Sequence, residues 1–458
     1  MTIATIKKGE IIELDIEKLV YGGEGIGRFS DMTIFVTDTV PGDRVKAEIV
    51  SVKKNYAKAV VKEILQSAEN RVKPFCGLAN TCGGCQWQYI DYEEQLKAKK
   101  QMVEESLEKI AGIKTQVNDT LRSPETRKYR CKVQFPVGQT KVSKRVLAGY
   151  YKKGTHEIIN IKHCPVQPEL IDKVTAFLRE KVQELQLPAY NEKNKKGLIR
   201  HFVYRYSWTN SNFILTIVIN NNKIPHNLVK LCNDVKQNFP QAEGVAVNFN
   251  TAKTNVILGR QSQLIAGKDY VTEIIEGKTF RISQDAFFQV NPSAASQMFM
   301  EVKKLVEEKT DFPKILDIYA GAGGFSIFLS DVVRHITAIE SAKSSVNDGL
   351  ENIKQNNISN MEYIKENAEI AVPKLASEGN KFDVTILDPP RKGCSEEVLQ
   401  GVMDVTDRFL VYISCNPATL ARDMKVLKEK FRVKLVQPVD MFCHTYHVET
   451  ILLAERIN

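Results

Sequence analysis

Four short apolar segments in the last third of the chain constrain its fold more than any other feature. Each has the length of a buried strand, and helical patterns separate one segment from the next. Strands that alternate with helices form a parallel sheet covered by those helices, because parallel strands need a crossover connection. We therefore expect an α/β domain over residues 286–458, with strands at 314–320, 335–340, 382–387 and 409–414.

The rest of the chain predicts two further domains. Residues 1–67 alternate apolar and polar positions in short runs separated by Gly-rich turns, which is typical of a small antiparallel, OB-like β-barrel. Residues 68–285 are turn-rich at first and then mostly strand-like, so we expect an α+β domain there. A length of 458 residues agrees with about three domains of ~150 residues each.

One helix is expected inside the central region, at residues 91–112. Asp91 and Glu94 can cap its start, and Gly112 can end it. Its apolar stripe consists of Leu96, Val103, Leu107 and Ile110.

Composition excludes several classes of protein. With 43% hydrophobic and 26% charged residues, the chain is too apolar to be disordered and too varied to be fibrous. Its longest apolar stretches, such as residues 213–219, are far shorter than the ~18 residues that a membrane span needs. Residues 1–9 lack the apolar core of a signal peptide, so we expect a cytoplasmic protein without membrane contact.

A glycine-rich loop follows the first apolar strand of the C-terminal domain. The sequence Asp317-Ile-Tyr-Ala-Gly-Ala-Gly-Gly324 lets the backbone approach a ligand closely. Glu340 ends the next strand, where a carboxylate can accept hydrogen bonds from both hydroxyls of a ribose. A dinucleotide site would need a glycine at position 326, where this chain has Ser326. The loop instead resembles the S-adenosylmethionine loop of class I methyltransferases.

A second motif, Asp388-Pro389-Pro390-Arg391, follows the third apolar strand. Strand exits at this edge of an open sheet are where ligands bind. Methyltransferases that act on amino groups resemble it but carry an aromatic residue where this chain has Arg391. The replacement argues against nitrogen as the methyl acceptor and is compatible with carbon.

Cys415 ends the fourth apolar strand and is the candidate nucleophile. Carbon 5 of uracil is a poor nucleophile, but a thiolate that adds to C6 places carbanion character on C5, which divides one hard step into two easier ones. A free thiol has a pKa of ~8.5, so we expect nearby groups that lower the pKa of Cys415.

A base must then remove the C5 proton before the thiolate can leave. Glu449, on the last apolar strand, is the candidate, and His444 and His447 are alternatives.

Nine cysteines in a chain of this length do not form a secreted disulfide framework, so metal binding or catalysis is favoured. Three are close together in a turn-rich segment where Gly83 and Gly84 allow tight turns, and one lies far downstream. This pattern suits a four-thiolate site, either an iron-sulfur cluster or tetrahedral zinc. The four candidate ligands are Cys76, Cys82, Cys85 and Cys164, and we interpret Cys131, Cys232, Cys394 and Cys443 as core residues.

The net charge of +9 is concentrated in residues 122–162, which contain eleven basic and two acidic side chains. Aromatic residues are interleaved with them, as in Lys128-Tyr129-Arg130 and Tyr150-Tyr151-Lys152. Cations for phosphates and rings for unstacked bases are what binding of single-stranded RNA requires. A solvated charged face is the alternative interpretation.

The whole chain resembles the RNA 5-methyluridine methyltransferase family, in particular its 23S ribosomal RNA members with an N-terminal TRAM domain. The resemblance rests on the motifs D-I-Y-A-G-A-G-G, D-P-P-R-K-G, S-C-N-P-A-T-L-A-R-D and H-T-Y-H-V-E-T, which occur in the family's order. It implies a TRAM barrel, a central iron-sulfur domain and a Rossmann-like class I methyltransferase domain. It also implies that the helix at 91–112 packs on the catalytic domain.

The same resemblance assigns roles to residues. Cys415 would be the nucleophile and Glu449 the general base, and the four-cysteine site would carry a [4Fe-4S] cluster as in the matching ribosomal RNA enzymes. The contacts to S-adenosylmethionine would be Gln289, Tyr319, Glu340, Asn367 and Asp388.

The expected activity is therefore methylation of uridine C5 in 23S ribosomal RNA by a monomeric enzyme without an obligate protein partner. Transfer RNA is less favoured, because the family's transfer RNA members generally lack both the barrel and the cysteine cluster. Two alternatives come from other classes: a C5-cytosine RNA methyltransferase, and a non-enzymatic RNA-binding iron-sulfur protein.

Overall fold

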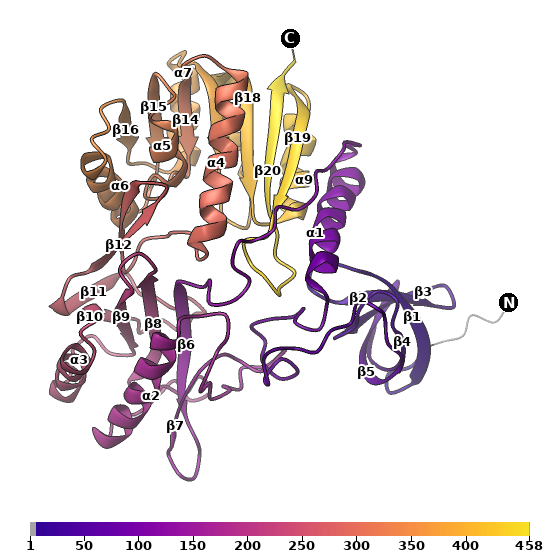
Figure 1. Cartoon of the computed structure of the whole chain (residues 1–458), viewed down its shortest axis with the longest axis vertical. Coiled ribbons are helices and arrows are strands. Elements are labelled where there is room, and N and C mark those ends of the chain that lie inside the picture. Colours follow the sequence, from indigo (N-terminus) through magenta and orange to yellow (C-terminus); the bar gives the residue numbers. More distant parts are fainter. Residues whose placement is uncertain (1–5, 458) are drawn as a thin grey trace.

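The structure, a computed structural model, describes residues 6–457, and a closed five-stranded barrel forms its N-terminal part (Figure 1). The strands follow the order β1-β2-β3-β5-β4, and alternate residues such as Val45, Ala47 and Ile49 fill the interior. Strand β5 pairs parallel to β3, so the expectation of a wholly antiparallel barrel was wrong. Five strands that alternate in direction cannot close a ring without one parallel pair. The strands are β1 (Ile11–Leu19), β2 (Gly25–Phe29), β3 (Met32–Thr37), β4 (Arg44–Val52) and β5 (Tyr56–Gln66).

A six-stranded sheet of order β11-β10-β9-β8-β6-β7 forms the central part. Helices α2 (Glu169–Glu184) and α3 (His226–Asn238) pack their apolar faces on one side of it. A two-stranded ribbon, β12 (Tyr270–Ile275) with β13 (Lys278–Ser283), leads to the C-terminal part. The strands of the sheet are β6 (Lys132–Gln139), β7 (Val146–Ala148), β8 (Ile199–Ser207), β9 (Asn212–Ile219), β10 (Ala242–Phe249) and β11 (Gln261–Gly267).

A seven-stranded sheet of order β16-β15-β14-β17-β18-β20-β19 forms the C-terminal part, and all four expected strands belong to it. The first five strands in this order pair in parallel, whereas β20 is antiparallel to both of its neighbours. The strands are β14 (Lys314–Ile318), β15 (His335–Ile339), β16 (Met361–Ile364), β17 (Phe382–Leu387), β18 (Thr406–Ser414), β19 (Phe431–Val439) and β20 (Glu449–Arg456).

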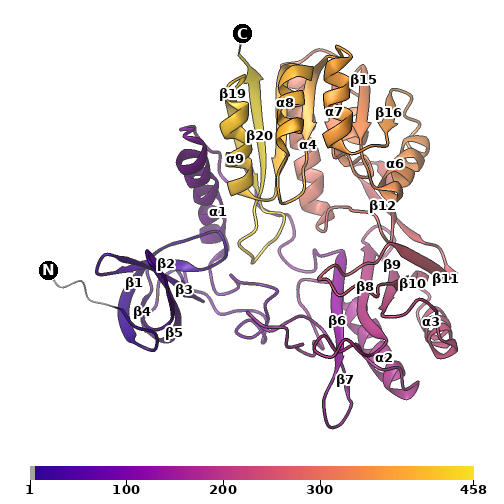
Figure 2. The ribbon, with the colours of Figure 1, turned by 180° about the vertical axis from the view of Figure 1, so that it is seen from behind.

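Helices cover both faces of this sheet. One core contains side chains of α4 and α5, and the other contains side chains of α7, α8 and α9, which Figure 2 shows in front of the sheet. Neighbouring residues on a strand point into different cores, as Ile315 and Leu316 do. The helices are α4 (Pro292–Lys309), α5 (Gly324–Leu329), α6 (Lys343–Gln355), α7 (Ala368–Ser377), α8 (Glu396–Val405) and α9 (Pro417–Leu427).

Helix α1 (Tyr92–Ser106) packs on the C-terminal part although it precedes the central sheet in the sequence (Figures 1 and 2). Val103 and Leu107 lie in the same core as α9. The helix continues into a π-helical turn, η1 (Leu107–Ala111), which ends at Gly112 with a φ of 65°. This wider turn rotates Ile110 outward, so the expectation that Ile110 belongs to the buried stripe was wrong; it is 41% exposed.

We propose that the domain boundaries follow residues 67 and 285. Among the described residues, no helix has the length and apolar character required to cross a bilayer.

Candidate active site and cysteine cavity

The glycine-rich loop after β14 bends sharply. Tyr319 has a φ of 68°, and Gly321 and Gly323 also have positive φ values, which bring the backbone around to the start of α5. The Gly321 amide donates to a carboxylate oxygen of Glu340 at 3.0 Å, and the Ala342 amide donates to the other at 2.6 Å. Glu340 is therefore held beside the loop by backbone donors.

A cavity of about 290 Å³ lies beside this loop. Its size is at the lower end of the range of roughly 300–1,000 Å³ for small-molecule sites. Three of the five expected cofactor contacts, Tyr319, Glu340 and Asn367, line it together with Pro390 and Lys392.

The other two expected contacts, Asp388 and Gln289, are not among the residues that line this cavity. Asp388 follows β17, and its amide donates to the Ile318 carbonyl at 3.3 Å. Gln289 lies in the loop before α4, where its carbonyl accepts from the Cys131 thiol.

Two carboxyl groups, the buried Asp317 and the half-buried Asp388, interact electrostatically under the loop. Asp317 accepts from the Ser326 hydroxyl at 2.6 Å, and its other oxygen has no hydrogen-bond partner among the described residues. Burial raises the pKa of Asp317 to about 6. Burial, with repulsion from Asp317, raises the pKa of Asp388 to about 7. Both groups therefore titrate near neutral pH. Carboxyl groups with such raised pKa values are typical of functional sites.

Cys415 directly follows β18, and Glu449 begins β20, the neighbouring antiparallel strand. Ser414 on β18 pairs with Thr450 on β20, so one more step of the register sets Cys415 opposite Glu449. Cys415 is partly buried, and Glu449 is 5% exposed. Both side chains also interact electrostatically with Asp388 and Arg391, so the sheet edge brings two residues of the Asp388-Pro389-Pro390-Arg391 motif to Cys415 and Glu449.

Burial dominates the acidity of both groups. It raises the pKa of Cys415 to about 12, with repulsion from Glu449 acting in the same direction and Arg391 opposing it. The pKa of Glu449 is raised well above its ordinary value by burial and by Asp388. The N-terminus of α9, whose N-cap is Asn416, also favours a thiolate at position 415. The expectation that neighbours lower the thiol pKa was therefore wrong as a net effect, because burial outweighs them.

The two histidines that were alternatives to Glu449 differ in their surroundings. His444 has its Nε2 3.0 Å from the Thr126 carbonyl and its Nδ1 3.4 Å from the Gln95 amide, so both ring nitrogens are engaged in packing contacts. His447 lies among aromatic rings. Burial lowers the pKa of each imidazole to about 4, so each is neutral near pH 7.

Sequence reasoning missed one residue at this edge, Tyr21 of the barrel. Its hydroxyl lies 3.5 Å from the Cys415 carbonyl, and its pKa is raised to about 12 by burial and by neighbouring acidic groups. A tyrosine before two glycines gives no signal that it will meet a residue 394 positions away.

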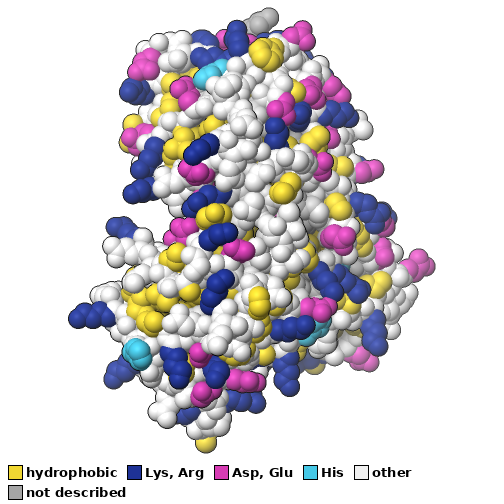
Figure 3. All heavy atoms as spheres, turned by 60° about the vertical axis from the view of Figure 1, so that its left-hand side comes forward, with side chains coloured by type: hydrophobic (Ala, Val, Ile, Leu, Met, Phe, Trp, Pro, Cys, Tyr) yellow, Lys and Arg dark blue, Asp and Glu magenta, His cyan; other side chains and the backbone are white. Residues whose placement is uncertain are grey.

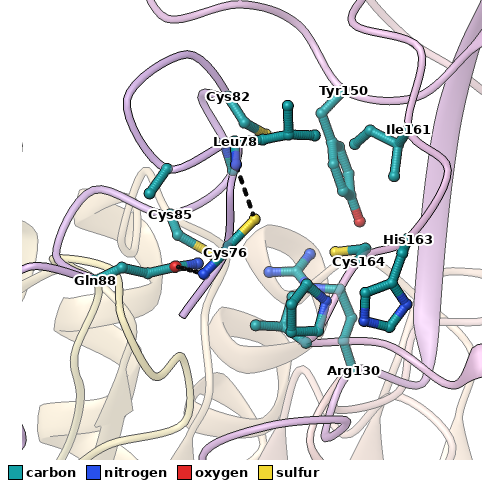
Figure 4. A pocket seen from close by; sticks show the side chains of 14 residues that line it. Cys76, Leu78, Cys82, Cys85, Gln88, Arg130, Tyr150, Ile161, His163 and Cys164 are labelled. Carbon is teal, nitrogen blue, oxygen red and sulfur yellow. Dashed lines mark hydrogen bonds between the residues drawn. The ribbon is translucent and has the colours of Figure 1, made fainter. Parts of the chain in front are cut away.

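The four expected ligand cysteines line one cavity of about 50 Å³ (Figure 4). The Leu78 amide donates to the Cys76 sulfur and the Gly84 amide to the Cys82 sulfur, each at 3.4 Å. Burial raises the pKa of Cys164 to about 12. The apolar side chains on the cavity wall include Leu78, Ala79, Ile161 and Val166.

No group of three or more His, Cys, Asp or Glu side chains within residues 6–457 is arranged to hold a metal ion. The four thiols thus share a cavity without forming a closed site for one ion. The other four cysteines, Cys131, Cys232, Cys394 and Cys443, are buried, as expected for core residues.

The basic segment at 122–162 is more structural than its composition indicated. Tyr129 is 2% exposed and donates to the Cys443 carbonyl, while Arg130 and Tyr150 line the cysteine cavity. The expectation that these three side chains face RNA was wrong, because Tyr129 packs against the C-terminal part and Arg130 and Tyr150 line the cysteine cavity. On the face in Figure 3, Lys and Arg side chains lie among Asp and Glu side chains and form no continuous basic surface.

Comparison with known proteins adds a family to this geometry. The family model described as tRNA (uracil-5-)-methyltransferase matches residues 91–457, and the TRAM domain model matches residues 6–62. A Clostridium tetani protein named as an RNA methyltransferase is 36% identical, with 98% of this chain and 97% of that protein covered. A protein with the same type of name from Caldanaerobacter subterraneus is 37% identical, with 99% of both chains covered.

Among solved structures, the fold is similar to that of the Pyrococcus abyssi tRNA (uracil-54, C5)-methyltransferase in complex with S-adenosyl-L-homocysteine. The TM-score is 0.75, the sequence identity is 24%, and the match covers 97% of this chain and 100% of the other. The barrel, central sheet and C-terminal sheet thus recur together in a protein of that fold.

Proposed function

The chain belongs to the tRNA (uracil-5-)-methyltransferase family and carries a TRAM domain, and on that premise we propose that it methylates C5 of uridine in 23S ribosomal RNA. Cys415 would act as the nucleophile and Glu449 as the general base. The single observation that carries this proposal is the strand register that sets Cys415 opposite Glu449, at the edge of the sheet where the glycine-rich loop also ends.

The proposed reaction begins when the Cys415 thiol releases its proton to solvent water. The thiolate adds to C6, and the electrons of the 5,6 double bond become an enolate with carbanion character at C5. S-adenosylmethionine supplies an electrophilic methyl group, which C5 captures.

Glu449 then takes the C5 proton, the double bond re-forms, and the Cys415 thiolate leaves. The net products are 5-methyluridine, the demethylated cofactor and one proton. Burial raises the pKa of Glu449, which makes its carboxylate a stronger base for this proton than an exposed glutamate would be.

For the cofactor, we propose contacts from Tyr319, Glu340 and Asn367 on the 290 Å³ cavity, and further contacts from Asp388 and Gln289. Glu340 is suited to the ribose hydroxyls, because its carboxylate is already fixed by two backbone amides. Asp388 would connect the two halves of the site, since it interacts with both Cys415 and Glu449.

For the cysteine cavity, we propose a [4Fe-4S] cluster held by Cys76, Cys82, Cys85 and Cys164. The type of donor supports this proposal, because four thiols line one apolar cavity and backbone amides donate to two of the sulfurs, although the thiols are not arranged around a single ion. A cavity of about 50 Å³ exceeds the roughly 10–15 Å³ that one water requires, so it has room for more than a single ion. Four protein ligands leave no open iron, so the cluster would link residues 76–85 to residue 164 and take no part in methyl transfer.

Zinc is the second candidate for this cavity. Four cysteine thiolates also bind zinc tetrahedrally, with zinc-sulfur bonds of ~2.3 Å. Analysis of iron, zinc and acid-labile sulfide in protein purified without oxygen separates the two. One zinc without sulfide would contradict the cluster.

Transfer RNA is a second candidate substrate, because the solved structure with the matching fold is a transfer RNA enzyme and also covers 97% of this chain. The barrel does not separate the two substrates, because it recurs in that transfer RNA enzyme. We favour ribosomal RNA because the sequence motifs and the four-cysteine pattern resemble those of the ribosomal RNA enzymes of this family. Mapping 5-methyluridine in both RNA fractions from cells with and without the gene distinguishes the two: loss confined to transfer RNA would contradict our assignment.

The chemistry itself is tested by incubating the protein and cofactor with RNA that contains 5-fluorouridine. Fluorine cannot leave C5 as a proton, so the Cys415 adduct should persist through denaturation. A C5-cytosine enzyme would instead be trapped by 5-fluorocytidine, and a non-enzymatic RNA-binding protein would be trapped by neither.

A further inference from the structure

The barrel reaches the catalytic edge of the C-terminal sheet through the turn between β1 and β2. Tyr21, on this turn, is 38% exposed, and its hydroxyl lies 3.5 Å from the Cys415 carbonyl. Its phenol also interacts electrostatically with Cys415, Arg391 and Glu449. An aromatic ring from the N-terminal barrel is therefore next to the proposed nucleophile and base.

The turn that carries Tyr21 is fixed in place. Gly22 and Gly23 have φ values of 116° and 89°, and the Gly23 carbonyl accepts from the indole nitrogen of the fully buried Trp87 at 3.1 Å. A Cβ atom at Gly23 would lie 3.1 Å from the ring of Tyr446 and 3.1 Å from Gln86. The close approach thus requires glycine, and it holds the barrel against the loop that precedes Glu449.

Tyr21 is part of an aromatic group at this edge. Its ring packs edge-on against Tyr446, with 5.1 Å between the ring centroids, and its centroid lies 6.3 Å from that of His447. The centroids of Tyr446 and His447 are 4.2 Å apart. Both partners lie just before Glu449 in the sequence. Residues from the two ends of the chain therefore form one aromatic surface beside the reactive thiol.

We propose that Tyr21 packs against the extruded target uridine and so makes the barrel a part of the base-binding site. The inference rests on the proposed function. A base that leaves its stack loses stacking partners, and an aromatic ring in the binding site can replace them. Positioning the ring is then a task of the barrel, and correct docking of the barrel becomes a condition for efficient attack on C6.

The chemistry of Tyr21 agrees with this role. Its pKa of about 12 keeps the phenol uncharged at neutral pH, so the ring adds no repulsion towards RNA. Its contact with the Cys415 carbonyl is at the outer limit of hydrogen-bond length, so the ring matters more than the hydroxyl.

The test compares Tyr21→Ala and Tyr21→Phe in the full chain. The readouts are the rate of adduct formation with 5-fluorouridine RNA, KM and kcat for methylation, and the affinity for S-adenosylmethionine. A matched control is Tyr56→Ala, which removes another barrel tyrosine with an aromatic neighbour, at 5.3 Å from Phe35. We expect Tyr21→Ala to slow adduct formation by about 5- to 150-fold, the range that corresponds to ~1 to 3 kcal/mol of base stacking. Tyr21→Phe should keep most of the rate, and the cofactor affinity should not change.

A second measurement replaces Tyr21 with the photoreactive p-benzoylphenylalanine, which should cross-link to the target nucleotide in the trapped complex. An equal rate for Tyr21→Ala and the natural protein, or equal losses for Tyr21→Ala and Tyr56→Ala, would overturn the role of Tyr21 and leave the proposed function intact. A Tyr21→Phe variant as slow as Tyr21→Ala would overturn a role for the ring. If the natural protein forms no adduct at all, the proposed function fails and this inference fails with it.

Discussion

Cys415 and the cysteines of the cavity are two kinds of thiol. Burial raises the pKa in both cases, but the neighbouring groups differ. Burial raises the pKa of Cys415 and that of Cys164 to about 12. Cys415 ends a strand next to the N-terminus of α9, with Glu449 and Arg391 beside it. Cys164 faces three other cysteines across an apolar cavity.

Burial alone therefore does not assign a role to a cysteine. A carboxyl group and a cation at a sheet edge allow a thiol to exchange its proton and attack a substrate. A ring of thiols in an apolar cavity, with amides that donate to sulfur, favours binding of a soft metal centre. Substitutions at each site should therefore have effects of different kinds.

The largest effect is expected when the proposed nucleophile is removed. Cys415→Ala should lower methylation by at least about 10⁴-fold, because the first bond to C6 cannot form. The measurement is incorporation of labelled methyl groups into RNA. Cys232→Ala, which removes a thiol from the core of the central part, is the control and should retain activity. Turnover by the Cys415 variant at a tenth of the natural rate would exclude covalent catalysis by this thiol.

Glu449→Gln tests the proposed general base beside Cys415. Methyl transfer should still occur, but the C5 proton should remain, so a methylated protein-RNA adduct accumulates and turnover falls by roughly 10²- to 10⁴-fold. Mass spectrometry of the adduct detects the added methyl group. Glu455→Gln, an exposed-end change on the same strand β20, is the control. Normal product release by Glu449→Gln would move the base to another residue.

Cys164→Ser tests the proposed iron-sulfur site in the cysteine cavity. We expect loss of iron and sulfide and a fall in the free energy of unfolding of roughly 3 kcal/mol, because the link between distant segments is removed. Metal analysis and thermal denaturation measure these effects, again with Cys232→Ala as control. An unchanged iron content would show that Cys164 is no ligand.

The smallest effect is expected at Arg391, the cation beside the proposed nucleophile. Arg391 lowers the pKa of Cys415, so Arg391→Gln should raise that pKa and move the pH profile of adduct formation to higher pH, with about a tenfold lower rate at neutral pH. In both proteins the rate should rise with pH, because only the thiolate attacks. Arg408→Gln, at the opposite end of β18, is the control. An unshifted profile would mean that Arg391 does not act on the thiol.

The layout of the C-terminal sheet could be predicted from sequence because its signals are local. The segments at 382–387 and 409–414 are apolar runs bounded by helical patterns, and each became a strand of the sheet. Cys415 and Glu340 could be placed at the edge of the sheet by the same logic, since they follow such strands.

Features that depend on contacts between distant segments could not be predicted. Tyr129 stands between basic residues as an RNA-facing aromatic would, yet it packs into the junction between domains. Tyr21 meets Cys415 only because the barrel docks on Trp87 and the loop before Glu449. The widened turn at 107–111 likewise has no local sign, because its sequence suits an ordinary helix as well.

The position of α1 has a consequence for synthesis of the chain. The buried ion pair between Lys99 and Asp440 joins residues 341 positions apart. A ribosome that adds ~5 to 20 residues per second needs on the order of 20 to 70 s to cover that distance. During this interval Val103 lacks its core partners in the C-terminal part, whereas Ala98 and Met102 can already pack on the barrel and on residues 87–90. We expect nascent chains stalled before residue 417 to bind chaperones through α1, and completed chains to release them.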